Sequence, residues 1–250
     1  MFVNNSSRAS IAAFWLAVGG AAYVIQTHPH PPSAARQLRE QRRTPADYVY
    51  VPGGECWIGT DDADADEDVR PRRRVFVPSF YMGAREVSQA EWKRFRPEFK
   101  IAPGKEAYPV TAITLEDAAA YCRFAGGRLP TDVEWEKAAR GTDGRRYPWG
   151  DRFELLRANV RGIAGGEFQP ITRYKPGEVC SGVSRLKPVD AFAAGASPYG
   201  AINMAGNAWE WVSDAYHGNS KTRIIRGGAA GYWERDARTY NRALEGAGVT

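Results

Sequence analysis

Short apolar or alternating segments bounded by turn residues recur from residue 48 onward, which predicts short β-strands. Residues 48–51 read Tyr-Val-Tyr-Val and end at Pro-Gly-Gly, so residues 56–59 (Cys-Trp-Ile-Gly) are expected to be the partner in a hairpin. Residues 74–77 and 80–82 show similar strand patterns. The folded domain is therefore expected to begin at residue 48 with β structure.

Helices are predicted where a capping residue precedes a periodic segment. Thr114 and Thr131 are each followed three residues later by a carboxylate, a spacing that satisfies backbone N–H groups at a helix start. The expected helices run from Ser88 through Phe95, over residues 115–125 and over residues 132–140. Beyond Trp149 the periodicity disappears for about 70 residues, a length of irregular chain that is uncommon unless it is functional or held by ions.

The segment 61–68 contains six acidic residues in eight. Asp62, Asp64 and Asp66 have the alternate spacing of a calcium-binding loop, but Glu67 replaces the turn glycine and the closing position is not acidic. We therefore expect a solvated loop and no EF-hand.

The N-terminus carries an uncharged apolar run over residues 11–25. About 20 residues are needed to span a bilayer, so this run is marginal as a spanning helix and long enough for an export signal or signal anchor. We favour an uncleaved apolar helix that anchors the chain in the membrane, with the domain outside the cytoplasm. Cleavage near Gly20 and a buried core helix remain open alternatives.

The predicted organisation has three parts: a signal anchor or signal peptide over residues 1–27, a Pro- and Arg-rich linker over 28–47, and a domain over 48–250. Three cysteines, Cys56, Cys122 and Cys180, fit an oxidising compartment, but their odd number allows no disulfide assignment. No two lie within a few residues of each other, so they predict no zinc site.

Composition changes this picture only by excluding classes. With 43% hydrophobic and 25% charged residues, the chain is neither disordered nor fibrous, and its 8 Trp, 26 Gly and 16 Pro favour a turn-rich domain. The net charge of +5 is concentrated in arginine clusters near residues 36–43 and 70–74, and no aromatic residues interleave with them. A nucleic-acid partner is therefore not expected.

A series of motifs resembles the sulfatase-modifying-factor family, which contains the formylglycine-generating enzymes. The motifs, in chain order, are Val-Pro-Gly-Gly (51–54), Glu-Val-Ser (86–88), Pro-Val-Thr (109–111), Gly-Arg-Leu-Pro-Thr-Asp-Val-Glu-Trp-Glu (127–136), Tyr-Pro-Trp-Gly (147–150), Pro-Val-Asp (188–190), Gly-Asn-Ala-Trp-Glu-Trp (206–211) and Arg-Gly-Gly (226–228). The resemblance covers about residues 48–242. It implies an α+β fold, a variant of the C-type lectin fold with little regular secondary structure.

Active members of this family oxidise a cysteine of a sulfatase peptide to formylglycine with copper and oxygen, using a pair of thiolates. Here the positions that match the thiols are Tyr232 and Ala237, and Ala229 replaces the serine that usually follows the double glycine. A phenol and a methyl group cannot hold copper(I) as two thiolates do, so copper and the oxidase chemistry are not expected. The chain also ends without the closing Gly-Phe-Arg strand typical of the family, which suggests either truncation or absence of that strand.

The resemblance also implies calcium, a hard cation that binds several oxygens. The positions matching one family site are Asn203, Gly206, Ala208 and Glu210, and a second site would use Asn159 and Val160. The alternative for Asn203 and Glu210 is ordinary turn hydrogen bonding. The acidic partner of the second site has no clear match.

The candidate binding residues are Tyr232, Trp233, Arg226 and His217. Competing structural roles are buried ion pairing for Arg226 and plain surface exposure for His217. No catalytic residue is predicted, because Tyr232 and Ala237 stand at the thiol positions. Helix capping explains Asp132 and Glu134, so no acid–base pair is invoked.

The predicted function is a membrane-tethered, extracytoplasmic domain that lacks the oxidase chemistry and binds a peptide or protein during maturation. The alternative is an oxidoreductase of the same superfamily with a different metal site or substrate, such as the pyoverdine-maturation or ergothioneine-type relatives. The latter usually carry an additional domain with an iron-binding histidine cluster, which this chain lacks.

Overall fold

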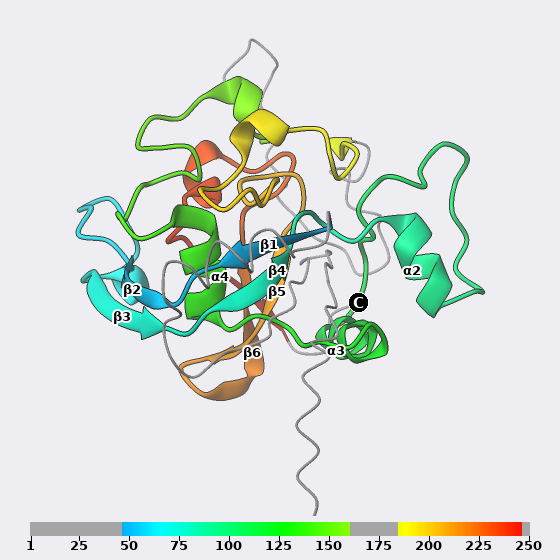
Figure 1. Cartoon of the computed structure of the whole chain (residues 1–250), viewed down its shortest axis with the longest axis horizontal. Coiled ribbons are helices and arrows are strands. Elements are labelled where there is room, and N and C mark those ends of the chain that lie inside the picture. The colour runs from blue at the N-terminus through cyan, green and yellow to red at the C-terminus, as the bar shows by residue number, and fades with distance from the viewer. Residues whose placement is uncertain (1–46, 161–184, 247–250) are drawn as a thin grey trace, which may run out of the picture.

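The structure is a computed structural model that describes residues 47–160 and 185–246. Within these residues the strands form three small antiparallel sheets. They consist of β1 (Tyr48–Val51) with β4 (Phe80–Gly83), β2 (Gly54–Ile58) with β3 (Arg73–Val77), and β5 (Glu210–Tyr216), β6 (Asn219–Arg226) and β7 (Ala243–Gly246) in that order. Figure 1 shows β1 and β4 in the middle of the molecule, with the β2–β3 hairpin at one side.

The expected hairpin between residues 48–51 and 56–59 is wrong. Strand β1 pairs with β4, with Val49 opposite Met82, while β2 pairs with β3, with Cys56 opposite Val75. The reason lies in burial: β1 and β4 are almost entirely buried, whereas β2 and β3 each have exposed residues. The two apolar strands pair with each other in the core, and the two partly polar strands pair at the surface.

The three predicted helices are confirmed. They are α2 (Gln89–Phe95), α3 (Leu115–Phe124) and α4 (Asp132–Arg140). Ser88 and Thr131 form complete capping boxes with Glu91 and Glu134, and the Thr114 side chain accepts from the backbone N–H of Asp117. Aromatic rings of α2 and α3 pack together, with Trp92 and Tyr121 centroids 5.1 Å apart. In Figure 1 these two helices lie on the side opposite the β2–β3 hairpin.

Helix α4 runs through the core, and its charged residues are buried with their partners. Trp135 is fully buried, as are Glu136 and Arg226. Glu136 Oε1 accepts hydrogen bonds from the Gly59 backbone N–H at 2.6 Å and from Arg140 Nη1 at 2.7 Å, and its Oε2 accepts from Arg226 Nη2 at 2.9 Å. Glu136, Arg140 and Arg226 are tolerated in the interior because each has an opposite charge and further hydrogen bonds. The buried Lys137 ammonium donates instead to the Gly54 and Val77 carbonyls, at 3.0 and 3.2 Å.

The sequence predicts a solvated loop over residues 61–68. Most of its acidic residues are exposed, and several of them also bind other parts of the fold. Asp62 accepts from the Tyr240 hydroxyl at 2.6 Å, and Asp64 forms an ion pair of 2.8 Å with Arg238. Arg242 donates to the Asp68 carbonyl at 2.6 Å. The loop therefore binds the segment that follows β6 through several of its acidic residues, although none of these residues is buried.

The described residues form a mixed α/β domain with few helices, which confirms the broad fold class predicted. Among them, no helix is long and apolar enough to cross a membrane. The predicted N-terminal apolar helix, the linker up to residue 46 and Cys180 lie outside the described residues.

Candidate functional site

The loop that precedes β5 brings the two predicted groups of calcium ligands together. The Asn159 backbone forms a parallel bridge with Gly206, and the Asn207 N–H donates to the Asn159 carbonyl at 2.8 Å. Gly206 has a φ of 87°, and a Cβ there would lie 2.5 Å from the Asn159 carbonyl oxygen. Only glycine permits this close approach. Residues of the two candidate calcium sites therefore lie side by side, at Asn159 and Gly206.

Two asparagines of this loop adopt left-handed backbone conformations, with φ of 61° at Asn203 and 65° at Asn207. Asparagine tolerates this region better than most residues, because its short polar side chain bonds locally. Both side chains point at Glu86, which follows β4 and is fully buried. Asn203 Nδ2 donates to Glu86 Oε2 at 2.7 Å, and Asn207 Nδ2 donates to the same oxygen at 2.8 Å.

We call Glu86, Asn203, Asn207 and Asn159 the amide cluster. Asn207 Oδ1 accepts from Asn159 Nδ2 at 2.8 Å and from the Lys187 backbone N–H at 2.9 Å. Burial raises the pKa of Glu86 to about 8, although hydrogen bonds from Asn207, Asn203 and the Ala208 N–H favour its charged form. The cluster thus contains a carboxyl group that is held by uncharged hydrogen-bond donors.

Asn203 Oδ1 is the atom of the amide cluster that lacks a partner. It is buried and has no hydrogen bond within the described part of the chain. The two N–H groups of Asn203 go to Glu86 and to the Val189 carbonyl, at 2.7 and 2.9 Å, so the oxygen faces away from both. A buried acceptor without a donor costs free energy, and a bound cation would remove that cost.

Glu210 supplies a buried carboxylate at the first position of β5. Its Oε2 accepts a short hydrogen bond from Trp135 Nε1 of α4. Within residues 47–160 and 185–246, no three His, Cys, Asp or Glu side chains gather as a metal site, so the predicted calcium set depends largely on amide and carbonyl oxygens. Such oxygens suit calcium, and the unpartnered Asn203 Oδ1 fits this ion.

The positions that match the copper thiols do not fit copper. Ala237 has no exposed surface and packs with Ala158 and Ala205. Tyr232 is 43% exposed, and its ring meets Trp209 edge to face with centroids 5.2 Å apart. Neither position offers a sulfur ligand, so these two side chains support no reaction step through copper.

The two described cysteines do not replace that pair. Cys56 and Cys122 are buried, free thiols in the main core cluster. Burial raises the pKa of the Cys56 thiol to about 11 and that of Cys122 well above its usual range. A metal-binding or nucleophilic cysteine must lose its proton, and both of these sites oppose that loss.

The four predicted binding residues do not form one group. Trp233 is 43% exposed and follows Tyr232 on the surface. Arg226 is fully buried, where it binds Asp132 and Glu136, so its side chain offers no surface to a ligand. His217 is exposed in the turn between β5 and β6, with its ring against Tyr216, at the opposite end of that hairpin from Arg226.

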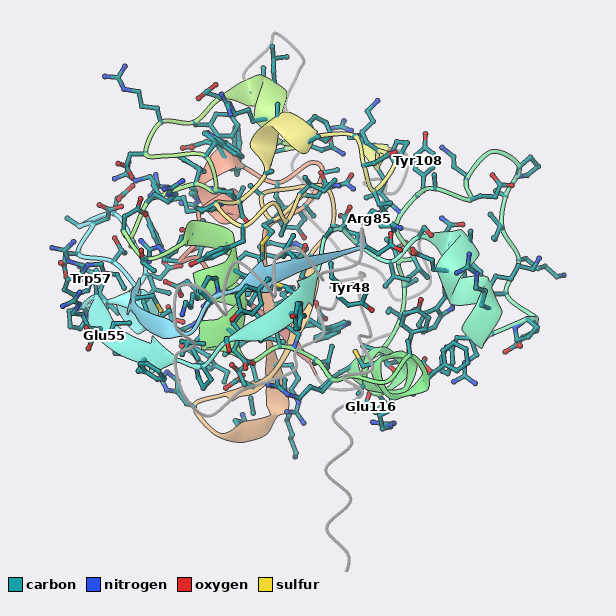
Figure 2. All side chains as sticks on the ribbon, in the orientation of Figure 1. Tyr48, Glu55, Trp57, Arg85, Tyr108 and Glu116 are labelled. Atoms are coloured by element: carbon teal, nitrogen blue, oxygen red, sulfur yellow. The ribbon has the colours of Figure 1, made fainter. Side chains whose placement is uncertain are left out.

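A further partly buried aromatic residue packs against Ala208 and Ala230, which neighbour Trp209 and Tyr232 in the sequence. Tyr108, labelled in Figure 2, packs against the cluster of Leu186, Ala208 and Ala230, and the Lys105 ammonium lies 3.7 Å from its ring centroid. We call the exposed rings of Tyr232 and Trp233, with the buried Trp209 beneath Tyr232, the aromatic surface. Glu86, Asn207 and Tyr108 were not identified as site residues from the sequence. For Glu86, the signal that could have found it is an acidic residue shortly after an apolar strand.

Short sheets, few helices and long irregular segments define a loop-rich mixed α/β class. The chain belongs to the sulfatase-modifying factor family, because the profile described as "Sulfatase-modifying factor enzyme 1-like domain" matches residues 34–248.

Relatives of this chain include proteins with opposite descriptions. The formylglycine-generating enzyme of Bos taurus is 32% identical over 244 aligned residues, and the match covers 75% of this chain and 63% of that enzyme. The inactive C-alpha-formylglycine-generating enzyme 2 of Mus musculus is 29% identical over 232 residues, with 72% of each chain covered. This chain therefore spans less than two thirds of the length of the bovine enzyme.

Among solved structures, PvdO from Pseudomonas aeruginosa matches with a TM-score of 0.63 and 20% identity. The match covers 80% of this chain and 88% of PvdO. This similarity concerns the fold alone.

Proposed function

We propose that this chain is a member of the family without formylglycine-generating activity, which binds a peptide or protein through the aromatic surface. The observation that carries the proposal is which side chains stand at the two positions that match the family's thiols. Tyr232 has an exposed phenol, and Ala237 has a buried methyl group. The mouse relative described as inactive is a precedent for such a member.

The aromatic surface supports the binding part of the proposal. Tyr232 and Trp233 are each 43% exposed, and large half-exposed aromatic rings are typical anchors for peptide side chains. Trp209 is buried beneath Tyr232 and fixes that ring by an edge-to-face contact. A rigid aromatic group gains binding energy without a large loss of side-chain entropy.

We further propose that calcium stabilises the loop before β5 through Asn203, Glu210 and the Gly206 and Ala208 carbonyls. Asn159 and Val160 would supply ligands of the second calcium site, which adjoins the first. When bound, the ion would supply a positive charge to oxygens that face the interior. The extracytoplasmic location and the membrane anchor over residues 11–25 are also parts of the proposal, and a reporter fused to Thr250 that is active only outside the cytoplasm would test them.

The test of the enzymatic part uses a peptide with the Cys-x-Pro-x-Arg pattern, incubated with the full chain and copper under air. We expect no aldehyde by mass spectrometry, because neither Tyr232 nor Ala237 can provide a thiolate. Copper-dependent formation of formylglycine would overturn the proposal and favour the alternative, an oxidoreductase with another metal site. In parallel, peptides selected on the native chain from a displayed library should bind Trp233→Ala more weakly. Binding unaffected by that change would remove the aromatic surface from the proposal.

A further inference from the structure

The orientation of the Asn203 side chain is fixed by two acceptors on one side of it. Nδ2 has two N–H groups, and they go to Glu86 Oε2 at 2.7 Å and to the Val189 carbonyl at 2.9 Å. Oδ1 therefore points the other way, into buried space where no described group donates to it. If the amide turned over, an N–H group would occupy that position, and N–H groups do not bind cations.

Glu86 is the group that makes the turned-over amide unfavourable. Its two oxygens receive Asn203 Nδ2, Asn207 Nδ2 and the Ala208 backbone N–H. Several donors converge on one side chain, so both of its terminal atoms have to accept hydrogen bonds, as the two oxygens of a carboxyl group can. A glutamine could accept with one oxygen only and would direct its own N–H groups at the neighbouring amides.

Through Asn207, the Glu86 carboxyl group is also linked to Asn159, which belongs to the second candidate calcium site. Glu86 binds Asn207 Nδ2, which orients Asn207 Oδ1 toward Asn159 Nδ2 at 2.8 Å. Asn159 in turn lies against Gly206 through the parallel backbone bridge. One buried side chain thus sets the direction of two asparagine amides and the separation of two loop segments.

We propose that Glu86 is a positioning residue for a divalent-cation site, and that it acts by holding Asn203 Oδ1 toward the ion. This inference rests on the proposed calcium site but adds a residue that is not itself among its predicted ligands. Groups that orient metal ligands are often almost as important as the ligands, and their loss typically weakens metal binding about 10- to 100-fold.

The experiment measures calcium binding by calorimetry and the rise in melting temperature from chelator to excess calcium, using the full chain. Glu86→Gln should raise the calcium Kd at least about tenfold and shrink the rise in melting temperature. Glu91→Gln is the matched control, because Glu91 lies on the following helix and binds Arg85 and Ser88. This control should lower the melting temperature equally with and without calcium and leave Kd unchanged.

A second comparison separates positioning from general loss of structure. In an Asn203→Ala background, Glu86→Gln should weaken calcium binding no further, because the amide through which Glu86 acts is gone. If Glu86→Gln does not fold, Glu86→Asp keeps the carboxyl group but draws it back from the asparagine amides, and it should also weaken binding. Native calcium affinity in the folded Glu86 variant would overturn the positioning role alone. If calcium neither binds nor stabilises the native chain, the proposed calcium site fails and this inference fails with it.

Discussion

Two buried carboxyl groups in this molecule have opposite kinds of partner, neutral amides at Glu86 and positively charged arginines at Asp132. Glu86 and Asp132 are both almost completely removed from solvent. Glu86 is held by amides, and burial raises its pKa to about 8. Burial also acts to raise the pKa of Asp132, but the charges of Arg226 and Arg242 outweigh that effect and hold this pKa below its usual range. Burial alone therefore does not decide whether a carboxyl group stays charged; the charge of its partners does.

The two regions also differ in whether their buried polar atoms all have partners within the described residues. Around Asp132, Arg226 also binds Glu136 and the carbonyls of Thr239 and Asn241, so charges and hydrogen bonds are matched inside the protein. In the amide cluster, neutral amides hold Glu86, and Asn203 Oδ1 has no hydrogen-bond donor among residues 47–160 and 185–246. The first region joins α4 to β6 and the segment that follows it, whereas the second retains the unpartnered oxygen to which we assign the proposed cation.

Breaking the charged region should have the largest effect. Arg226→Ala takes a buried partner from both Asp132 and Glu136, and removal of one member of a buried pair costs about 3–5 kcal/mol. Urea unfolding should show this loss. Arg72→Ala is the control, because its ion pair with Asp61 is about half exposed and should contribute about 0–1 kcal/mol. Equal losses in both variants would remove the distinction between the two kinds of pair.

Calcium should act on the amide region and spare the charged one. Calcium that binds only the folded state at a hundred times its Kd adds about 2.7 kcal/mol, so a chelator should lower the melting temperature of the native chain. Glu210→Ala should lose most of this increment. Arg72→Ala, which removes none of the proposed ligands, should retain it. Identical melting curves with chelator and calcium for the native chain would contradict the calcium site.

The two carboxyl groups should also give opposite pH dependences. Glu86 has a folded pKa of about 8, above the usual 4.5, so its contribution to stability is complete below about pH 4.5 and is lost as pH rises toward 8. Asp132 has a lowered pKa, so its contribution is complete above its usual value of 3.8 and is lost as pH falls below it.

The free energy of unfolding is measured at each pH in the presence of a chelator, so that no bound cation changes the net charge of the amide cluster. The free energy of unfolding should decline between about pH 4.5 and 8 with a slope of at most about 1.4 kcal/mol per pH unit from Glu86. Glu86→Gln should flatten that part of the curve. Parallel curves for the native chain and the variant would show that Glu86 does not titrate differently in the folded state.

The sequence contained the local structure more fully than the pairing of distant parts. The caps at Thr114 and Thr131 act over three residues, and they located α3 and α4 correctly. The pairing of β1 with β4 depends on which strands are buried on both faces. That signal was present in the continuous apolar run of residues 48–51 but was outweighed by the nearby Pro-Gly-Gly turn.

The candidate site shows the same limit. Asn203 and Glu210 were identified through resemblance, and the structure places both in buried positions. Glu86 was missed because it meets Asn207 across 121 positions of the chain, a contact that no local pattern encodes. The acidic segment 61–68 is largely exposed, as expected, but its bonds to Arg238 and Tyr240 were not foreseen because these partners lie far along the chain.

The alanine cluster around Ala237 makes the absence of the second thiol hard to reverse. Ala237 has no exposed surface, and its backbone nitrogen would lie 3.1 Å from a Cβ added at Gly228. A cysteine at position 237 adds a sulfur atom to filled space, and overpacking typically costs about 1–3 kcal/mol. A lower melting temperature for Ala237→Cys would measure that cost. Packing of this kind therefore restricts which side chains position 237 can accept, because a thiol would fit there only if the neighbouring residues made room for it.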